Sequence, residues 1–212
     1  MATTPKNHSS TPASDTTPIA VHVEIERELS GPKWCAKYPG SHDVSTLRPS
    51  FQLPVGDFIA AIEAGGGVVS PQSTLRPKER AYLMEVAWLI MHGEILPEKV
   101  KPMDGVPIEW VHPTKEKSIA AATAMCARYS IMRLETKPAG PSSLHCFGEA
   151  IDMNISWKDK LEIKNQDGST ATITSIPRDV MNSDLAKVGA SYGVIKFYAG
   201  AKDRPHWSTT GR

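Results

Sequence analysis

Two polar segments, far apart in the chain, constrain its fold more than any other feature of the sequence. The first is SLHCFGEAID at residues 143–152, and the second is KDRPHW at residues 202–207. Together they offer two imidazoles, at His145 and His206, and one carboxylate, at Asp152. Imidazole nitrogen and carboxylate oxygen are both zinc ligands. If one metal ion binds all three side chains, the fold has to bring the two segments together.

The first segment has local features that suit a metal site. Ala150 and Asp152 lie two positions apart on an expected strand, so both side chains occupy the same face of it. The small Ala150 methyl leaves room beside the carboxylate. Gly148 allows the backbone to turn between His145 and the strand. Taken singly, the histidine suits an ordinary loop and the aspartate an ordinary surface, and only their combination indicates a site.

The second segment predicts a proton acceptor beside the metal. Asp203 precedes His206 by three residues, and Pro205 fixes the backbone between them. A zinc site with three protein ligands keeps a fourth position for water, which the metal makes acidic. Asp203 is then expected to act as the general base. Ser143 is a candidate to bind substrate, and Trp207 a candidate for the pocket wall because it directly follows a ligand.

Hydrophobic periodicity and chain breakers predict a mixed fold with helices early and strands late. Helices are expected over Asp57–Ala64, from Pro77 to a stop at Gly93, over Lys115–Tyr129, and from a Ser183 cap to Tyr192. Strands are expected over Ile19–Arg27, Val68–Leu75, Gly148–Ile155, Leu161–Lys164, Thr170–Thr174 and Val194–Tyr198. Pro71 places its strand at an edge or a bend. The sum is one α+β domain with a mostly antiparallel sheet flanked by helices.

Composition limits the classes of partner. Residues 1–18 are rich in Ser, Thr and Pro and are expected to be a disordered tail, followed by a domain over residues 19–212. The net charge of +1 gives no basic surface for nucleic acid and no polybasic membrane signal. Three separated cysteines, at 35, 126 and 146, predict reduced thiols. Neither a signal peptide nor a membrane span is recognisable, so we expect synthesis in the cytoplasm.

The two segments together match a family pattern. SxHxxGxAxD followed by DxxH resembles the zinc D-alanyl-D-alanine carboxypeptidases, the vancomycin-resistance dipeptidases and the phage cell-wall endopeptidases, whose fold the sonic-hedgehog signalling domains share. The DxPH form is most similar to the L-alanyl-D-glutamate endopeptidase branch. The resemblance implies zinc bound by His145, Asp152 and His206, with Asp203 as general base. It also implies hydrolysis of peptidoglycan stem peptides.

Arg76 matches a third family element less closely. Members carry an arginine at the end of a strand, just before a helix, in a Ser-Gly-Tyr-Arg-like segment. Here the segment reads Ser73-Thr74-Leu75-Arg76, so its central pair differs. The resemblance implies that Arg76 binds a substrate carboxylate or the oxyanion, which suits a planar, permanently charged guanidinium. The alternatives are a helix-start arginine paired with Glu79, and Arg133 in the substrate-binding role.

Several functional alternatives remain open from the sequence. Within the same family, the chain can be a D-alanyl-D-alanine carboxypeptidase or dipeptidase. A non-catalytic, metal-stabilised binding domain of hedgehog type is the alternative from another class. A cysteine peptidase using Cys146 is disfavoured, because adjacent side chains on an extended chain point to opposite faces. Wall-directed chemistry without a signal peptide predicts delivery to the periplasm by another route, either as a phage lysis enzyme or as a secreted toxin with an immunity partner.

Overall fold

The computed structural model describes Met1 and residues 26–212 of the chain. The tail predicted over residues 1–18 lies, beyond Met1, outside the described residues, and so does nearly all of the strand predicted over Ile19–Arg27.

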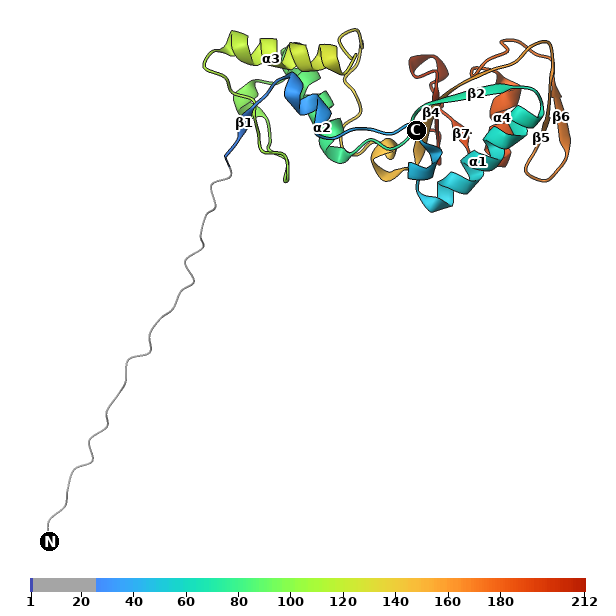
Figure 1. The fold of residues 1–212 in the computed structure, drawn as a ribbon, viewed down its shortest axis with the longest axis horizontal. Helices are drawn as coiled ribbons and strands as arrows, with labels where there is room; N and C mark the ends of the chain where they lie inside the picture. The colour runs from blue at the N-terminus through green and yellow to red at the C-terminus, as the bar shows by residue number, and fades with distance from the viewer. Residues whose placement is uncertain (2–25) are drawn as a thin grey trace.

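The described chain is a mixed α+β domain in which an antiparallel sheet is flanked by helices (Figure 1). The α-helices are α1 (Pro49–Ala64), α2 (Lys78–Met91), α3 (Lys115–Arg128) and α4 (Ser183–Ser191). The strands are β1 (Glu28–Leu29), β2 (Val68–Ser73), β3 (Ile108–Glu109), β4 (Ala150–Ser156), β5 (Leu161–Lys164), β6 (Thr170–Ile173), β7 (Ile195–Lys196) and β8 (His206–Ser208). Short 3-10 helices are η1 (Pro32–Ala36), η2 (Val44–Thr46), η3 (Pro97–Lys99), η4 (Leu144–Phe147) and η5 (Gly200–Lys202). The predicted fold class is therefore confirmed.

The main sheet has the strand order β2-β4-β8-β7, and every neighbouring pair is antiparallel. β4 lies inside the sheet, and its Asp152 pairs with Ser73 on one side and with His206 on the other. β2 is an edge strand whose register shifts between Pro71 and Ser73. The edge position expected from Pro71 is thus confirmed, because proline cannot donate a ladder hydrogen bond. β5 and β6 form the predicted hairpin.

One hydrophobic core joins the main sheet to α1 and α4. We call it the sheet cluster, and its fully buried members include Phe51, Val55, Phe58, Ile62, Ile151, Met153, Leu161, Leu185 and Trp207. The rings of Phe58 in α1 and Trp207 in β8 lie 5.4 Å apart between centroids. The two helices are therefore fixed to the sheet by aromatic and aliphatic side chains from alternate strand positions.

A second core is built mainly by α2 and α3. We call it the helical cluster, and its buried members include Trp34, Leu83, Ala87, Trp88, Ile90, Trp110, Ala122, Met125 and Cys126. Figure 1 shows α2 and α3 beside β1, apart from the sheet with α1 and α4. The chain leaves the sheet after β2, builds this cluster, and returns through η4 to β4. η4 therefore lies where the chain re-enters the sheet.

Three local predictions need correction. α1 begins at Pro49, not Asp57, and it continues through Pro54. Burial of Phe51 and Val55 against the sheet offsets the hydrogen bond that Pro54 cannot donate. The cap of α4 is Asn182 rather than Ser183, because the Asn182 side chain accepts from the amides that follow. β8 was not predicted, since three residues are too few to show periodicity.

Candidate metal centre

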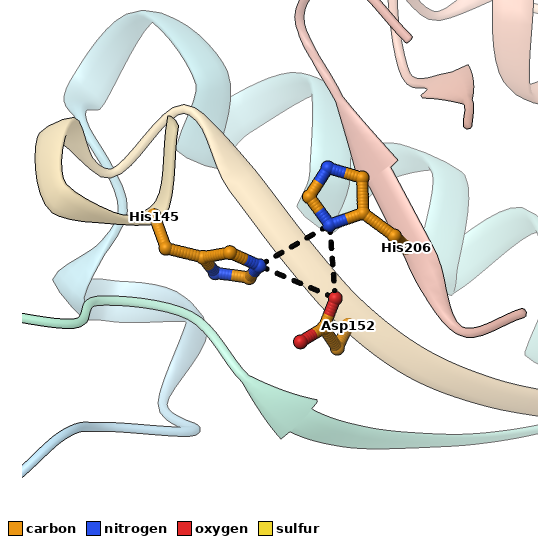
Figure 2. A group of neighbouring side chains, drawn as sticks. All are labelled: His145, Asp152 and His206. Atoms are coloured by element: carbon orange, nitrogen blue, oxygen red, sulfur yellow. Dashed lines mark hydrogen bonds and ion pairs between the residues drawn. The ribbon is translucent and has the colours of Figure 1, made fainter. Parts of the chain in front are cut away.

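Three side chains from three different elements converge at the sheet (Figure 2). His145 lies in η4, Asp152 in β4, and His206 opposite Asp152 in β8. Nε2 of His145 lies 3.2 Å from Oδ1 of Asp152 and 3.2 Å from Nδ1 of His206. Nδ1 of His206 lies 3.1 Å from the same carboxylate oxygen. The structure therefore brings together the three residues that the sequence predicted as ligands.

The three atoms are spaced as ligands of one metal ion would be. Zinc lies about 2.0–2.2 Å from nitrogen and oxygen ligands, so tetrahedral ligand atoms are separated by roughly 3.3–3.6 Å. The separations of 3.1–3.2 Å come close to that spacing. The donor set, two imidazoles and one carboxylate, is one that a divalent metal accepts. The group can therefore hold a metal ion with only small adjustments.

Asp152 is ionised in this arrangement. Its side chain is only 15% exposed, and burial alone would raise the pKa of the carboxyl group. The neighbouring imidazoles of His145 and His206 outweigh the burial and hold the pKa of this carboxyl group well below its usual range. The centre thus contains a fixed negative charge, which favours a bound cation.

The segment around His145 holds its ring in place. Nδ1 of His145 lies 2.8 Å from the backbone oxygen of Thr74, whose side chain is fully buried. The amide of Arg76 donates to the backbone oxygen of His145 at 3.1 Å. Gly148 ends η4 in the left-handed region at φ 66°, where a side chain is disfavoured. The end of β2 and the start of β4 therefore fix His145 from both sides.

Asp203 lies beside the centre but does not join it. Its side chain is half exposed, and Oδ2 lies 3.9 Å from Nδ1 of His206, beyond hydrogen-bond distance. Burial raises the pKa of the Asp203 carboxyl group, and the negative charge of Asp152 adds to this. A bound divalent cation would act in the opposite direction. Asp203 is thus placed as a neighbour of the centre, outside the ligand set.

Trp207 does not form a pocket wall, and that prediction is wrong. Its side chain is fully buried and packs on Phe58 in the sheet cluster. Successive side chains on a strand point to opposite faces, so the residue after the ligand His206 faces away from the centre. Ser143 lies directly before η4 and is partly buried, and its backbone oxygen accepts from Cys146 N at 2.8 Å. Its role in substrate binding stays a prediction.

Arg76 lies in the short connection between β2 and α2, and it lines a cavity of about 240 Å³. Arg80 lines the same cavity, but its guanidinium donates to the backbone oxygens of Cys35 and Tyr38 at 3.1 and 3.4 Å. None of the three candidate metal ligands is among the described residues that line this cavity. Arg133 is exposed after α3. Of the two arginines considered for substrate binding, Arg76 thus lines a cavity and Arg133 lies exposed on the surface.

The cysteine alternative finds no support in the geometry. Both ring nitrogens of His145 face other partners, Thr74 on one side and the metal-ligand group on the other. The Cys146 thiol lies 3.9 Å from the backbone oxygen of Gly140. Burial raises the pKa of this thiol, whereas a nucleophilic cysteine needs a lowered pKa. Cys146 is therefore not paired with its neighbouring histidine.

Sequence reasoning missed the groups that support the ligands. These include the backbone oxygens of Thr74 and Arg212, which face the outer nitrogens of His145 and His206. Any residue supplies a backbone oxygen, so such partners leave no signal in a sequence. Lys196 was also missed, although it donates from Nζ to the backbone oxygens of Arg204 and His206. Its burial lowers the pKa of the amine to about 8.

Comparison of the chain with protein-family models and with curated proteins finds no match in either case. Among the described residues, every helix is too short or too polar to cross a bilayer.

Proposed function

We propose that this chain is a zinc-dependent peptidase that hydrolyses peptidoglycan stem peptides, with the L-alanyl-D-glutamate bond as the favoured site. The observation that carries the proposal is the convergence of His145, Asp152 and His206 within 3.1–3.2 Å of one another. The same residues occupy the metal-ligand positions of the motif that resembles zinc cell-wall peptidases.

Zinc is the metal that best suits this donor set. Two imidazoles and one carboxylate are a common ligand set of catalytic zinc sites, which leave a fourth position for water or substrate. When bound, zinc supplies a Lewis acid that polarises a carbonyl group and makes water acidic. The carboxylate of Asp152 remains charged, so it needs no deprotonation before it binds a metal.

Residues around the centre supply proton transfer and substrate binding. Asp203 accepts a proton on its carboxylate as the nucleophile forms, and it returns the proton to the leaving amine. Its position 3.9 Å from His206 Nδ1 keeps it close to the centre without binding the metal. Arg76 binds a substrate carboxylate or the oxyanion through its guanidinium fork. The cavity that Arg76 lines at the end of β2 supports the first of these roles.

Wall-directed chemistry implies a place of action and a partner. The peptide substrate lies in the periplasm and cell wall, so the proposed place of action is there. As a phage lysis enzyme it would need a membrane pore, and as an injected toxin it would be matched by an immunity protein. The neighbouring genes distinguish these two settings.

The proposal is tested by digestion of purified peptidoglycan with the full chain loaded with zinc. New amino termini and the masses of the released fragments identify the bond that is cut. We expect new L-alanine carboxyl ends and new D-glutamate amino termini. Release of free D-alanine instead would support the carboxypeptidase alternative.

The matched controls are His145→Ala and Asp203→Asn, with zinc content measured on the same samples. His145→Ala should lose both zinc and activity, because it removes one of three ligands. Asp203→Asn should lose activity alone. If the zinc-loaded parent cuts no stem peptide at all, the peptidase proposal is wrong and a metal-stabilised binding domain takes its place.

A further inference from the structure

The outer nitrogens of both metal-site imidazoles face backbone oxygens. Nδ1 of His145 lies 2.8 Å from Thr74 O, and Nε2 of His206 lies 3.1 Å from Arg212 O. A neutral imidazole has one N–H, and the nitrogen that binds a metal is the one without hydrogen. When each imidazole donates to its backbone oxygen, the lone pairs of His145 Nε2 and His206 Nδ1 face the centre. The two oxygens can therefore stabilise the tautomers that a metal ion needs.

The oxygen that faces His206 is held by a turn over residues 208–212. The hydroxyl of Ser208 donates to Arg212 O at 3.1 Å and accepts from Gly211 N at 2.9 Å. Ser208 is fully buried, so these bonds are shielded from water. Tyr198 N donates to Gly211 O at 3.0 Å, which ties the turn to the segment after β7. The position of Arg212 O is thus set by Ser208 and Gly211.

Gly211 is required by the close approach of this turn to β7. Its φ is 73°, in the left-handed region that disfavours side chains. A Cβ added at Gly211 would lie 2.8 Å from Cγ2 of Ile195 and 3.0 Å from the backbone oxygen of Lys196. Any side chain here would push the turn away from β7, and Arg212 O would move with it.

We propose that the turn over residues 208–212 positions His206 as a metal ligand, with Ser208 and Gly211 as the positioning residues. The proposal rests on the metal site proposed above and extends it beyond the motif that ends at His206. Ser208 and Gly211 make no hydrogen bond to the three candidate ligand atoms, and they act through Arg212 O. Changes to such outer-shell partners typically lower metal affinity by about 10–100-fold.

The test compares zinc affinities of full-length variants by competition with a chromophoric chelator. Ser208→Ala removes the hydroxyl that links Gly211 N to Arg212 O, and Gly211→Ala displaces the turn by steric contact. Each should bind zinc about 10–100-fold more weakly than the parent. Thr210→Ala is the matched control, because Thr210 lies in the same turn with an exposed side chain. Its zinc affinity should equal that of the parent.

A second readout separates positioning from a purely structural role. Visible absorption of the cobalt-substituted protein reports the geometry and number of ligands, and it should change in Ser208→Ala and Gly211→Ala but not in Thr210→Ala. A purely structural role would lower only the unfolding free energy of the metal-free protein. If either variant folds and keeps the parental zinc affinity and cobalt spectrum, the positioning role is wrong and the metal site stands. If the parent itself binds no zinc, the proposed function fails as well.

Discussion

Asp203 is the residue that decides whether the centre is a catalyst or only a metal-binding site. Its carboxylate oxygen lies 3.9 Å from Nδ1 of His206. Asp203 is therefore near the candidate ligands but beyond hydrogen-bond distance of His206. Asparagine keeps the size of aspartate but cannot accept a proton. We therefore expect Asp203→Asn to lower the rate of stem-peptide cleavage by about 10²–10⁴-fold, as is typical for a general acid–base group.

The zinc content of Asp203→Asn should remain at the parental level, because the three ligands are unchanged. Cleavage rate and zinc stoichiometry are measured on one preparation. A variant that cuts as fast as the parent would remove Asp203 from the mechanism. Loss of zinc in this variant would instead make Asp203 a ligand.

Arg76 and Arg80 form a natural pair for testing substrate binding, because they line the same cavity. Arg80 donates to two backbone oxygens, whereas Arg76 is proposed to bind a carboxylate. Arg76→Lys replaces the planar fork with a single ammonium group. Hydrogen bonds to charged groups contribute about 1.5–3 kcal/mol, so kcat/KM should fall roughly 10–100-fold with normal zinc content.

Steady-state kinetics then distinguish the two roles considered for Arg76. A rise in KM with unchanged kcat indicates binding of a ground-state carboxylate, and a fall in kcat indicates the oxyanion. Arg80→Lys should lower the free energy of unfolding and leave KM close to the parental value. If Arg76→Lys leaves both parameters unchanged, the role passes to Arg133 or is absent.

At the scale of elements, η4 and β4 depend on Gly148 for their junction. Its backbone is left-handed at φ 66°, and an added Cβ would lie 2.6 Å from Arg48 N. Gly168 in the β5–β6 turn has a similar φ of 85° but open space around its Cα. Alanine at Gly168 should therefore lower the free energy of unfolding only by the cost of a left-handed backbone at a non-glycine residue, about 1–2 kcal/mol.

Gly148→Ala has the same backbone cost and adds a steric clash, so it should lower the free energy of unfolding more than Gly168→Ala does. It should also weaken zinc binding, because His145 lies in the 3-10 helix that Gly148 ends. Denaturant unfolding of the metal-free proteins and chelator competition measure the two effects. Equal stability and equal zinc affinity in both variants would show that the junction tolerates a side chain.

The sequence predicted elements well where the hydrophobic period ran over several residues or where glycine and proline marked the ends. α2, α3 and the β5–β6 hairpin appear within a residue or two of their predicted bounds. The predicted metal ligands converge because Asp152 and His206 lie opposite each other on neighbouring strands. Failures occurred at short or ambiguous features. The strand HWS of β8 is too short to show alternation. Without a predicted strand, the sequence could not show that the Trp207 side chain points into the core.

At the scale of the whole molecule, the chain divides its apolar residues between two cores. Periodicity in a sequence shows which face of a helix is buried, but not which neighbour buries it. The separation of α2 and α3 from the sheet was therefore not predictable from their patterns. All three candidate metal ligands belong to elements of the main sheet or lead directly into it. The helical cluster has its own core, built around Trp34, Leu83 and Met125.

This division predicts a local response to metal removal. Zinc at about 100 times its Kd would stabilise the folded state by about 2.7 kcal/mol through binding linkage. Opening of β4 and β8 separates the ligands and therefore has to release the metal. Opening confined to the helical cluster leaves the ligands together. Chelation should thus accelerate amide exchange in β4 and β8 by up to about 100-fold and leave α2 and α3 unchanged.

Hydrogen exchange of the full chain with and without chelator measures this, with His145→Ala as the control that should not respond. Uniform acceleration across both cores would mean that the two clusters open as one cooperative unit, because then every opening would release the metal. Acceleration limited to β4 and β8 would mean that the sheet can lose its metal while α2 and α3 stay folded. In that case the helical cluster keeps its folded structure whether or not the centre holds a metal ion.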